Sequence, residues 1–229
     1  NTWIATDECG NEAETLFTQV ITVIDTTAPA LVELAPNGET EINSCKDAAT
    51  TTVPFIAESI AEFYHDNCGE FVTVTATDTL LEGDNCSWTL TYTYKVEDEC
   101  GNSLDNETIT HTGGDQTAPA LVDLAPQGES DVNACAEEAT TAAPFEATTL
   151  AAFYADNCGG DVTVVPTDTT LNGGDCEWSL TYQFKVVDEC ENELIEQTIT
   201  HSGSNIDLPT WTSIANSLDT TISCDNEAA

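Results

Sequence analysis

The sequence has almost no basic side chains. Its 229 residues include three lysines and no arginine, against 42 aspartates and glutamates, and the formal net charge is −39. Such a chain has almost nothing to hold a phosphate backbone, which excludes nucleic acid as a partner. The same charge favours solubility and disfavours a compact state unless salt or divalent cations screen it.

Methionine and long apolar runs are absent as well. No stretch approaches the ~18 consecutive apolar residues that would span a bilayer, and no basic and apolar signal segment is present. We therefore expect no membrane span within this segment. Partial copies of a repeat at both ends lead us to expect that the protein continues beyond both termini.

Catalytic motifs are missing too. The sequence contains no G-x-S-x-G, no H-E-x-x-H and no phosphate-binding glycine loop. Of the three histidines, His65 is replaced by Ala155 in the second copy of the repeat, while His111 and His201 end strands beside glycines, where an exposed or capping histidine is expected. The sequence predicts that this segment is not an enzyme.

What the chain does contain is a repeat. Residues 25–114 recur as residues 115–204 at an offset of ninety positions, so that DTTAPALVELAP becomes DQTAPALVDLAP and FYHDNCG becomes FYADNCG. Residues 1–24 match the end of such a unit, and residues 205–229 restart it. The sequence therefore predicts a tandem array with two complete repeats and parts of two more.

Four cysteines repeat in step with the unit. Repeated cysteines indicate disulfides and an oxidising, extracellular location, and zinc is disfavoured because no C-x-x-C occurs. Two pairings stay open: one joins Cys68 to Cys100 at the outer ends of successive strands, and the other crosses the repeat boundaries, joining Cys9 to Cys45, Cys100 to Cys135 and Cys190 to Cys224. The repeated cysteines are Cys45, Cys68, Cys86, Cys100, Cys135, Cys158, Cys176 and Cys190.

The periodicity within each repeat is that of strands. In SWTLTYTYKVED, apolar residues from Trp88 to Val96 alternate with threonine and charged residues, which predicts a half-buried antiparallel strand. Residues 71–78, 39–45 and 106–112 alternate similarly. Residues 56–64 instead carry apolar side chains at helical spacing and predict a short helix. About ninety residues of this kind predict one immunoglobulin-like β-sandwich per copy, and the whole chain is expected to be all-β.

Two sequence motifs near the start of the chain are WIATDECGN from Trp3 and the later TQVITVIDTTAP. Together they resemble the HYR-like repeats of large secreted surface proteins of Bacteroidetes, including SprB-like gliding-motility adhesins. The resemblance implies an immunoglobulin-like fold, export by type IX secretion and a cell-surface fibre or adhesin. The second copy departs from the pattern at Glu191, which stands where the first copy has Gly101.

Two functions are compatible with these features. Disulfide-stapled copies that contact mainly their neighbours would form a stalk. Alternatively, each copy would bind surface polysaccharide or another cell-surface protein, with avidity from repetition. Proteins of the resembling group are O-glycosylated at Asp followed by Ser or Thr and a small or aliphatic residue, which makes Thr26, Thr79, Thr169 and Thr220 candidate sites.

Calcium is the cofactor that this composition favours, because Asp, Glu and Asn supply its oxygen ligands. One candidate geometry uses the turns that end two segments of each copy, and the other uses the boundary residues Asp25 and Asp115. Turn capping by the same side chains is an equally common role for Asp and Asn. The candidate turn ligands are Asp66, Asn67, Asp98, Glu99 and Asn102, with their equivalents Asp156, Asn157, Asp188, Glu189 and Asn192.

Overall fold

The computed structural model describes residues 1–32, 34–69, 71–122 and 124–210, and most of their regular structure is β-sheet. The all-β class is confirmed at this level. The chain divides into two units, Asn1–Gln116 and Thr117–Ala229. At the start of the first unit, β1 (Thr2–Trp3) pairs antiparallel with β2 (Phe17–Thr18).

The first unit is built on a four-stranded sheet with the order β4-β8-β7-β6. Three long antiparallel strands form most of it: β6 (Thr73–Gly83), β7 (Trp88–Glu97) and β8 (Ser103–Gly114). At one edge, the short β4 (Ile42–Asn43) runs parallel to β8. A separate antiparallel pair joins β3 (Ala30–Leu31) to β5 (Tyr64–His65).

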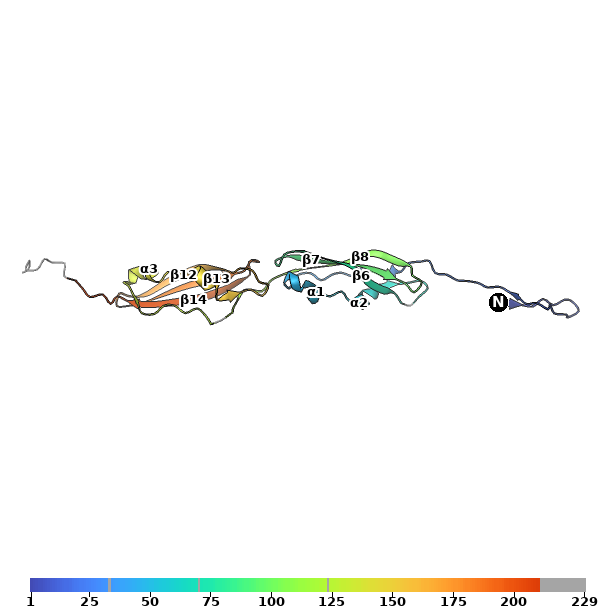
Figure 1. Cartoon of the computed structure of the whole chain (residues 1–229), viewed down its shortest axis with the longest axis horizontal. Coiled ribbons are helices and arrows are strands. Elements are labelled where there is room, and N and C mark those ends of the chain that lie inside the picture. The colour runs from blue at the N-terminus through green and yellow to red at the C-terminus, as the bar shows by residue number, and fades with distance from the viewer. Residues whose placement is uncertain (33, 70, 123, 211–229) are drawn as a thin grey trace, which may run out of the picture. The chain divides into compact units, whose positions relative to one another are not determined.

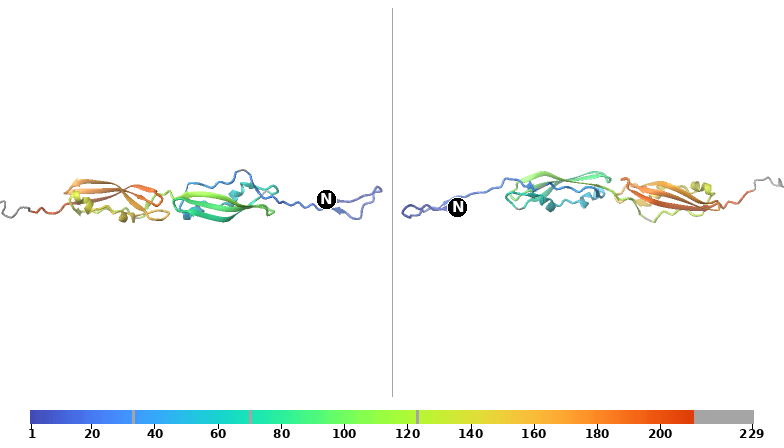
Figure 2. Two further views of the ribbon diagram at one scale, coloured as in Figure 1. Left: turned by 90° about the horizontal axis from the view of Figure 1, so that it is seen from above. Right: turned by 180° about the vertical axis from the view of Figure 1, so that it is seen from behind.

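The second unit repeats this topology with the order β10-β14-β13-β12. Figures 1 and 2 show its sheet with a helical segment on one face, as in the first unit. Its elements are β9 (Ala120–Leu121), β10 (Val132–Asn133), η2 (Ala136–Glu138), α3 (Ala139–Ala142), α4 (Ala147–Ala151), β11 (Tyr154–Ala155), β12 (Thr163–Gly174), β13 (Glu177–Val187) and β14 (Glu193–Ser204).

The inner face of the central strand forms the core of each unit. In β7, every second side chain from Trp88 to Val96 is buried, while the intervening residues are only partly covered. This matches the alternation in the sequence, since successive side chains of a strand point to opposite faces. Trp88 and its equivalent Trp178 are each 1% exposed, as the half-buried strand predicted from Trp88 to Val96 requires.

A mainly irregular segment covers that face. It contains η1 (Lys46–Ala48), α1 (Ala49–Thr52) and α2 (Ala57–Ala61). Ile60 of α2 packs with Tyr94 and Val96, while Ala49 and Val53 pack against Trp88. The helix expected over residues 56–64 is therefore present but shorter, because Tyr64 already belongs to β5.

Buried polar tips of β7 bind the backbone of the covering segment. The indole Nε1 of Trp88 donates to the carbonyl of Ser44 at 2.7 Å, and the hydroxyl of Tyr92 donates to the carbonyl of Val53 at 3.0 Å. In the second unit, Trp178 and Tyr182 make the same two bonds to backbone carbonyls, at 2.9 Å each. These bonds satisfy backbone carbonyls that have no sheet partner, as burial requires.

Among the cysteines that the structure describes, two disulfides form, one in each unit. Cys45 and Cys86 are bonded in the first, and Cys158 and Cys190 in the second. Cys45 lies beside Cys86 because the next residue, Lys46, donates its backbone N–H to Asn85. The cross-boundary pairing does not form, since Cys9, Cys100 and Cys135 are free thiols. Cys224 lies outside the described residues.

The close fit at the end of β14 generates a first prediction. A Cβ added at Gly203 would overlap the carbonyl oxygen of Val132 and the ring of Trp178. Overpacking of this kind destabilises by about 1–3 kcal/mol. We expect Gly203→Ala to lower the urea midpoint of the second unit, followed by tryptophan fluorescence.

Gly174→Ala is the matched control, because nothing lies within 4 Å of a Cβ at Gly174 and the first copy has Asp84 there. It should change stability by no more than about 0.5 kcal/mol. Equal effects of the two substitutions would contradict the packing described here.

Candidate functional site

Three segments that are distant in sequence meet at one end of the first unit. The antiparallel register of β3 with β5, in which Ala30 lies opposite His65, brings the residues before β3 alongside those after β5. The pairing of Thr73 with Glu97 places the turn after β7 at the same end. One aspartate from each segment contributes: the ligand atoms of Asp25, Asp66 and Asp98 lie within 4.8 Å of one another.

Asp66 is a buried member of this aspartate cluster. Its residue is 8% exposed, and its Oδ2 accepts backbone N–H bonds from Cys68 at 2.7 Å and Gly69 at 3.2 Å. These bonds fix the carboxylate in a turn. The other oxygen, Oδ1, is buried and has no hydrogen-bond partner among the described residues. A buried carboxylate oxygen without a partner is costly, so this atom requires an explanation.

Asp98 closes the turn after β7. Its Oδ1 accepts the backbone N–H groups of Cys100 and Asn102, each at 2.8 Å, and its Oδ2 accepts the side-chain amide of Asn102 at 2.8 Å. Burial raises the pKa of Asp98, but these hydrogen bonds outweigh burial and hold the pKa below its usual value. Asp98 is therefore ionised at neutral pH while it sits next to two other carboxylates.

The structure separates the predicted ligands into two groups. Asp66 and Asp98 face the cluster, whereas Asn67 donates to the sulfur of Cys68 and Asn102 is engaged with Asp98 as a turn cap. Glu99 is exposed and lines the small cavity beside the cluster. Asp25, which the sequence placed in a competing geometry, lies with Asp66 and Asp98. The two proposed geometries therefore share one location.

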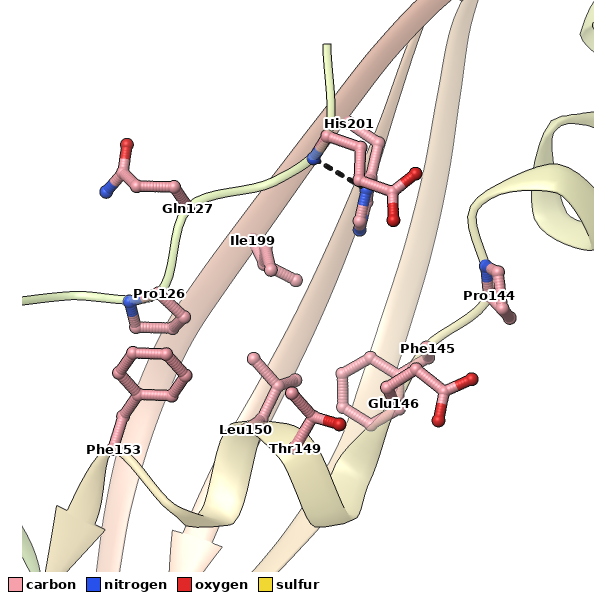
Figure 3. A pocket seen from close by; sticks show the side chains of 11 residues that line it. Pro126, Gln127, Pro144, Phe145, Glu146, Thr149, Leu150, Phe153, Ile199 and His201 are labelled. Atoms are coloured by element: carbon pink, nitrogen blue, oxygen red, sulfur yellow. Dashed lines mark hydrogen bonds between the residues drawn. The ribbon is translucent and has the colours of Figure 1, made fainter. Parts of the chain in front are cut away.

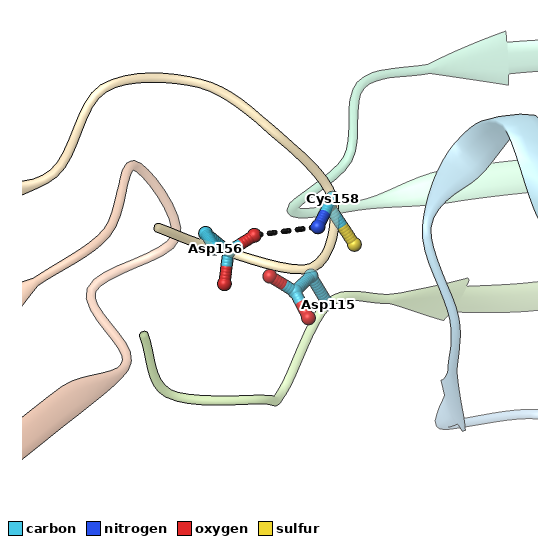
Figure 4. A group of neighbouring side chains, drawn as sticks. All are labelled: Asp115, Asp156 and Cys158. Carbon is cyan, nitrogen blue, oxygen red and sulfur yellow. Dashed lines mark hydrogen bonds between the residues drawn. The ribbon is translucent and has the colours of Figure 1, made fainter. Parts of the chain in front are cut away.

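The second copy has the same two turns. Asp156 accepts the backbone N–H of Cys158 at 2.7 Å (Figure 4), and Asn157 donates to the sulfur of Cys158. The Asp188 carboxylate accepts the backbone N–H groups of Cys190 and Asn192 and the side-chain amide of Asn192, so these residues again form a capped turn. Glu189 lies against Gly160, whose added Cβ would contact the Glu189 carboxylate at 2.9 Å.

Cysteines border this end of each copy. In the first unit, Cys68 and Cys100 are thiols that line a cavity of about 30 Å³ together with the three aspartates. Burial and the neighbouring carboxylates Asp25 and Asp66 raise the pKa of the Cys68 thiol. Their equivalents in the second unit, Cys158 and Cys190, are joined in a disulfide.

A second feature that recurs is an apolar pocket between the covering segment and the sheet. In the second unit its volume is about 270 Å³, and in the first about 260 Å³. Figure 3 shows Phe145, Leu150 and Phe153 on one side and Pro126 with His201 on the other. The equivalent pocket residues in the first unit are Phe55, Ile60, Phe63, Pro36 and His111.

The pocket was not anticipated from the sequence, although a Pro-Phe pair at Pro54 and Pro144 repeats at the ninety-residue offset. The histidine expectation was wrong. His111 and His201 are 8% and 7% exposed, because each ring packs against a core tyrosine and its Nδ1 accepts a backbone N–H.

The candidate O-glycosylation residues that the structure describes are exposed. Thr79 lies on β6 and Thr169 on β12, at equivalent positions of edge strands, and Thr26 precedes β3. Thr220 lies outside the described residues. Accessibility is a requirement for modification, and these three threonines meet it.

No protein-family model matches this chain, and a comparison with curated proteins found no match. Among the described residues, no helix has the length and apolar character needed to cross a membrane.

The repeat itself predicts further disulfides. Cys68 and Cys100 occupy the positions of the bonded pair Cys158 and Cys190, and Cys135 and Cys176 occupy those of Cys45 and Cys86. We expect protein produced under oxidising conditions to contain all four bridges. Mass spectrometry of non-reduced peptides, cleaved after acidic residues, should find the Cys68–Cys100 and Cys135–Cys176 linkages.

Cys9 serves as the internal control for this measurement. It matches Cys100 and Cys190 in sequence, but this chain of 229 residues has no cysteine at the position equivalent to Cys68 and Cys158, so Cys9 should remain open to alkylation. Alkylated Cys68 and Cys100 in a chain whose Cys158 and Cys190 are linked would contradict the equivalence of the copies.

The buried histidines predict a pH dependence of stability. Burial lowers the pKa of His111 and His201 below the usual 6.5, although Glu39 and Glu129 oppose the shift. The unfolded chain then binds protons that the folded chain does not. The neutral histidines therefore contribute their full stability above pH ~6.5, and this contribution is lost as the pH falls further. We expect a loss of about 1 kcal/mol per copy by pH 5.5, the value of one hydrogen bond.

Urea unfolding between pH 7.5 and 5.5 measures this loss. The variant with His111→Asn and His201→Asn should have a flatter profile, because an amide oxygen can accept the same N–H without titrating. His65→Ala, which introduces the residue found at Ala155, should leave the profile unchanged. A wild-type profile that is flat in this range contradicts the prediction.

Proposed function

We propose that this chain is a segment of an extracellular stalk, built from tandem immunoglobulin-like repeats, that carries other parts of a cell-surface adhesin or filament. The observation that carries the proposal is the recurrence of one complete folding unit. Both copies keep the central strand, its two bonds to the covering segment and the same topology. Repeats that are stabilised internally can be added in series without a new core.

Covalent stapling supports a load-bearing role. Disulfides form and persist outside the cell. Each stabilises the folded state by about 2–4 kcal/mol, mainly because it restricts the unfolded chain. A bridge between Cys45 and Cys86 joins the covering segment to the turn before β7. Force applied to the ends of a repeat would therefore release only the chain outside the closed loop.

The charge also supports this proposal. With a net charge of −39, neighbouring chains repel one another, which keeps long surface fibres separate and soluble. The resemblance to HYR-like repeats supports export through type IX secretion and a role in attachment or gliding motility. In this proposal the segment has no catalytic role, and the partners of each repeat are the neighbouring repeats of the same chain.

Single-molecule pulling on the whole chain tests the stalk. We expect two unfolding events of similar length, each longer after reduction by roughly 11–14 nm, because the reduced loops extend at ~3.5 Å per residue. The same lengths with and without reductant, or extension without discrete unfolding events, would contradict the proposal.

The repeated apolar pocket favours a second candidate function, in which each copy is a binding module for a surface glycan or a partner protein. Aromatic and proline side chains with a few polar groups are typical of binding sites. Saturable binding on a glycan or surface-protein array, lost on replacing Phe63 and Phe153 with alanine, would favour this function. Absence of binding by the wild-type chain would leave the stalk as the function of the segment.

A further inference from the structure

We propose that Asp25, Asp66 and Asp98 bind a calcium ion that ties the segment entering the first repeat to the body of that repeat. The three carboxylates come from three segments and have ligand atoms within 4.8 Å of one another. This inference goes beyond the stalk function and does not depend on it, since a binding module would use the same ion.

The buried oxygen of Asp66 is the observation that distinguishes this cluster from an ordinary acidic surface. Two backbone N–H groups hold Oδ2, while Oδ1 is buried and has no hydrogen-bond partner in the part of the chain that the structure describes. The residue as a whole is 8% exposed. Buried polar atoms in proteins are almost always satisfied by protein, water or an ion, and a cation supplies the missing partner here.

The chain has no basic side chain available to neutralise the cluster. Of its three lysines, Lys46 donates to the carbonyl of Gly83, and Lys95 and Lys185 pair with Glu97 and Glu193. Two of the three clustered aspartates, Asp66 and Asp98, are buried. Carboxylates this close repel one another unless an opposite charge offsets the repulsion, and that charge must come from solution.

The available ligands select calcium among common divalent cations. Carboxylate oxygens suit hard cations, and calcium accepts irregular sets of six to eight oxygens, whereas magnesium requires a near-ideal octahedron. The adjoining cavity of about 30 Å³ has space for an ion or water, which needs at least ~10–15 Å³. Zinc favours nitrogen and sulfur ligands, whereas the three residues of this cluster offer carboxylate oxygens only.

A bound ion would have a defined structural effect. Asp25 is held within its own segment by one bond, in which its Oδ1 accepts the backbone N–H of Thr27 at 3.1 Å. Asp66 and Asp98 are each fixed in a turn by several bonds. Coordination would therefore order the residues around Asp25 more than the two turns, which are already constrained.

Calcium titration of the whole oxidised chain tests the site through differences between variants, because a chain with 42 acidic residues also binds cations weakly elsewhere. Extracellular modules bind calcium at ~0.1–1 mM, which sets the range of the titration. We expect Asp66→Asn to bind one calcium ion fewer per chain than the wild type. Asp47→Asn, at an exposed position of η1, is the control and should bind as the wild type does.

Hydrogen exchange of the same proteins locates the ion. Calcium should slow exchange of the Thr27 amide at least tenfold in the wild type and in Asp47→Asn, and should have no such effect in Asp66→Asn. Asp25→Asn gives a second test if Asp66→Asn does not fold, since Asp25 lies outside both turns. Equal calcium stoichiometry in all variants would overturn the proposal. Equal protection by sodium chloride at the same ionic strength would also overturn it, because that result indicates screening.

Discussion

The rest of each unit depends on the inner face of its central strand. Five alternate side chains of β7 are buried, and two of them carry polar tips that bond to backbone carbonyls of the covering segment. A segment with little regular structure would otherwise bury unsatisfied carbonyls, at a cost that a small core cannot offset. The strand therefore supplies both the apolar contact and the hydrogen bonds that fix the second layer.

This constraint also positions the aspartate cluster. The hydroxyl of Tyr64 in β5 bonds to that of Tyr94 in β7 at 2.9 Å, so the turn that begins at Asp66 is anchored to the core two residues earlier. The Tyr64 hydroxyl also donates to Glu107 at 3.2 Å. In the second unit, Phe184 replaces Tyr94, and Tyr154 keeps only the second bond, to Gln197 at 3.3 Å, which stands at the position of Glu107. The turn is thus anchored to the core in both copies, with one polar bond fewer in the second.

The sequence predicted the long strands because their alternation extends over many residues, as from Trp88 to Val96. It could not predict the register of β3 with β5, since two-residue strands have no periodicity, and this register alone brings Asp25 to Asp66. The sequence did contain an indication of helix α1, because the buried residues Ala49 and Val53 are four residues apart, the spacing of one helical face. His111 was assigned to the surface because a strand end beside glycine gives no indication of the segment that covers it.

A comparison of the two copies separates the structural residues from the variable ones. His65 becomes Ala155 and Ile56 becomes Glu146 at exposed positions, whereas the tryptophan bond to the covering segment and both aspartate turns recur. Asp66 and Asp98 are buried in a chain that repels itself, although a surface position would cost less. Capping explains their backbone bonds but leaves Oδ1 of Asp66 without a partner among residues 1–32, 34–69, 71–122 and 124–210, so turn formation alone does not account for the cluster.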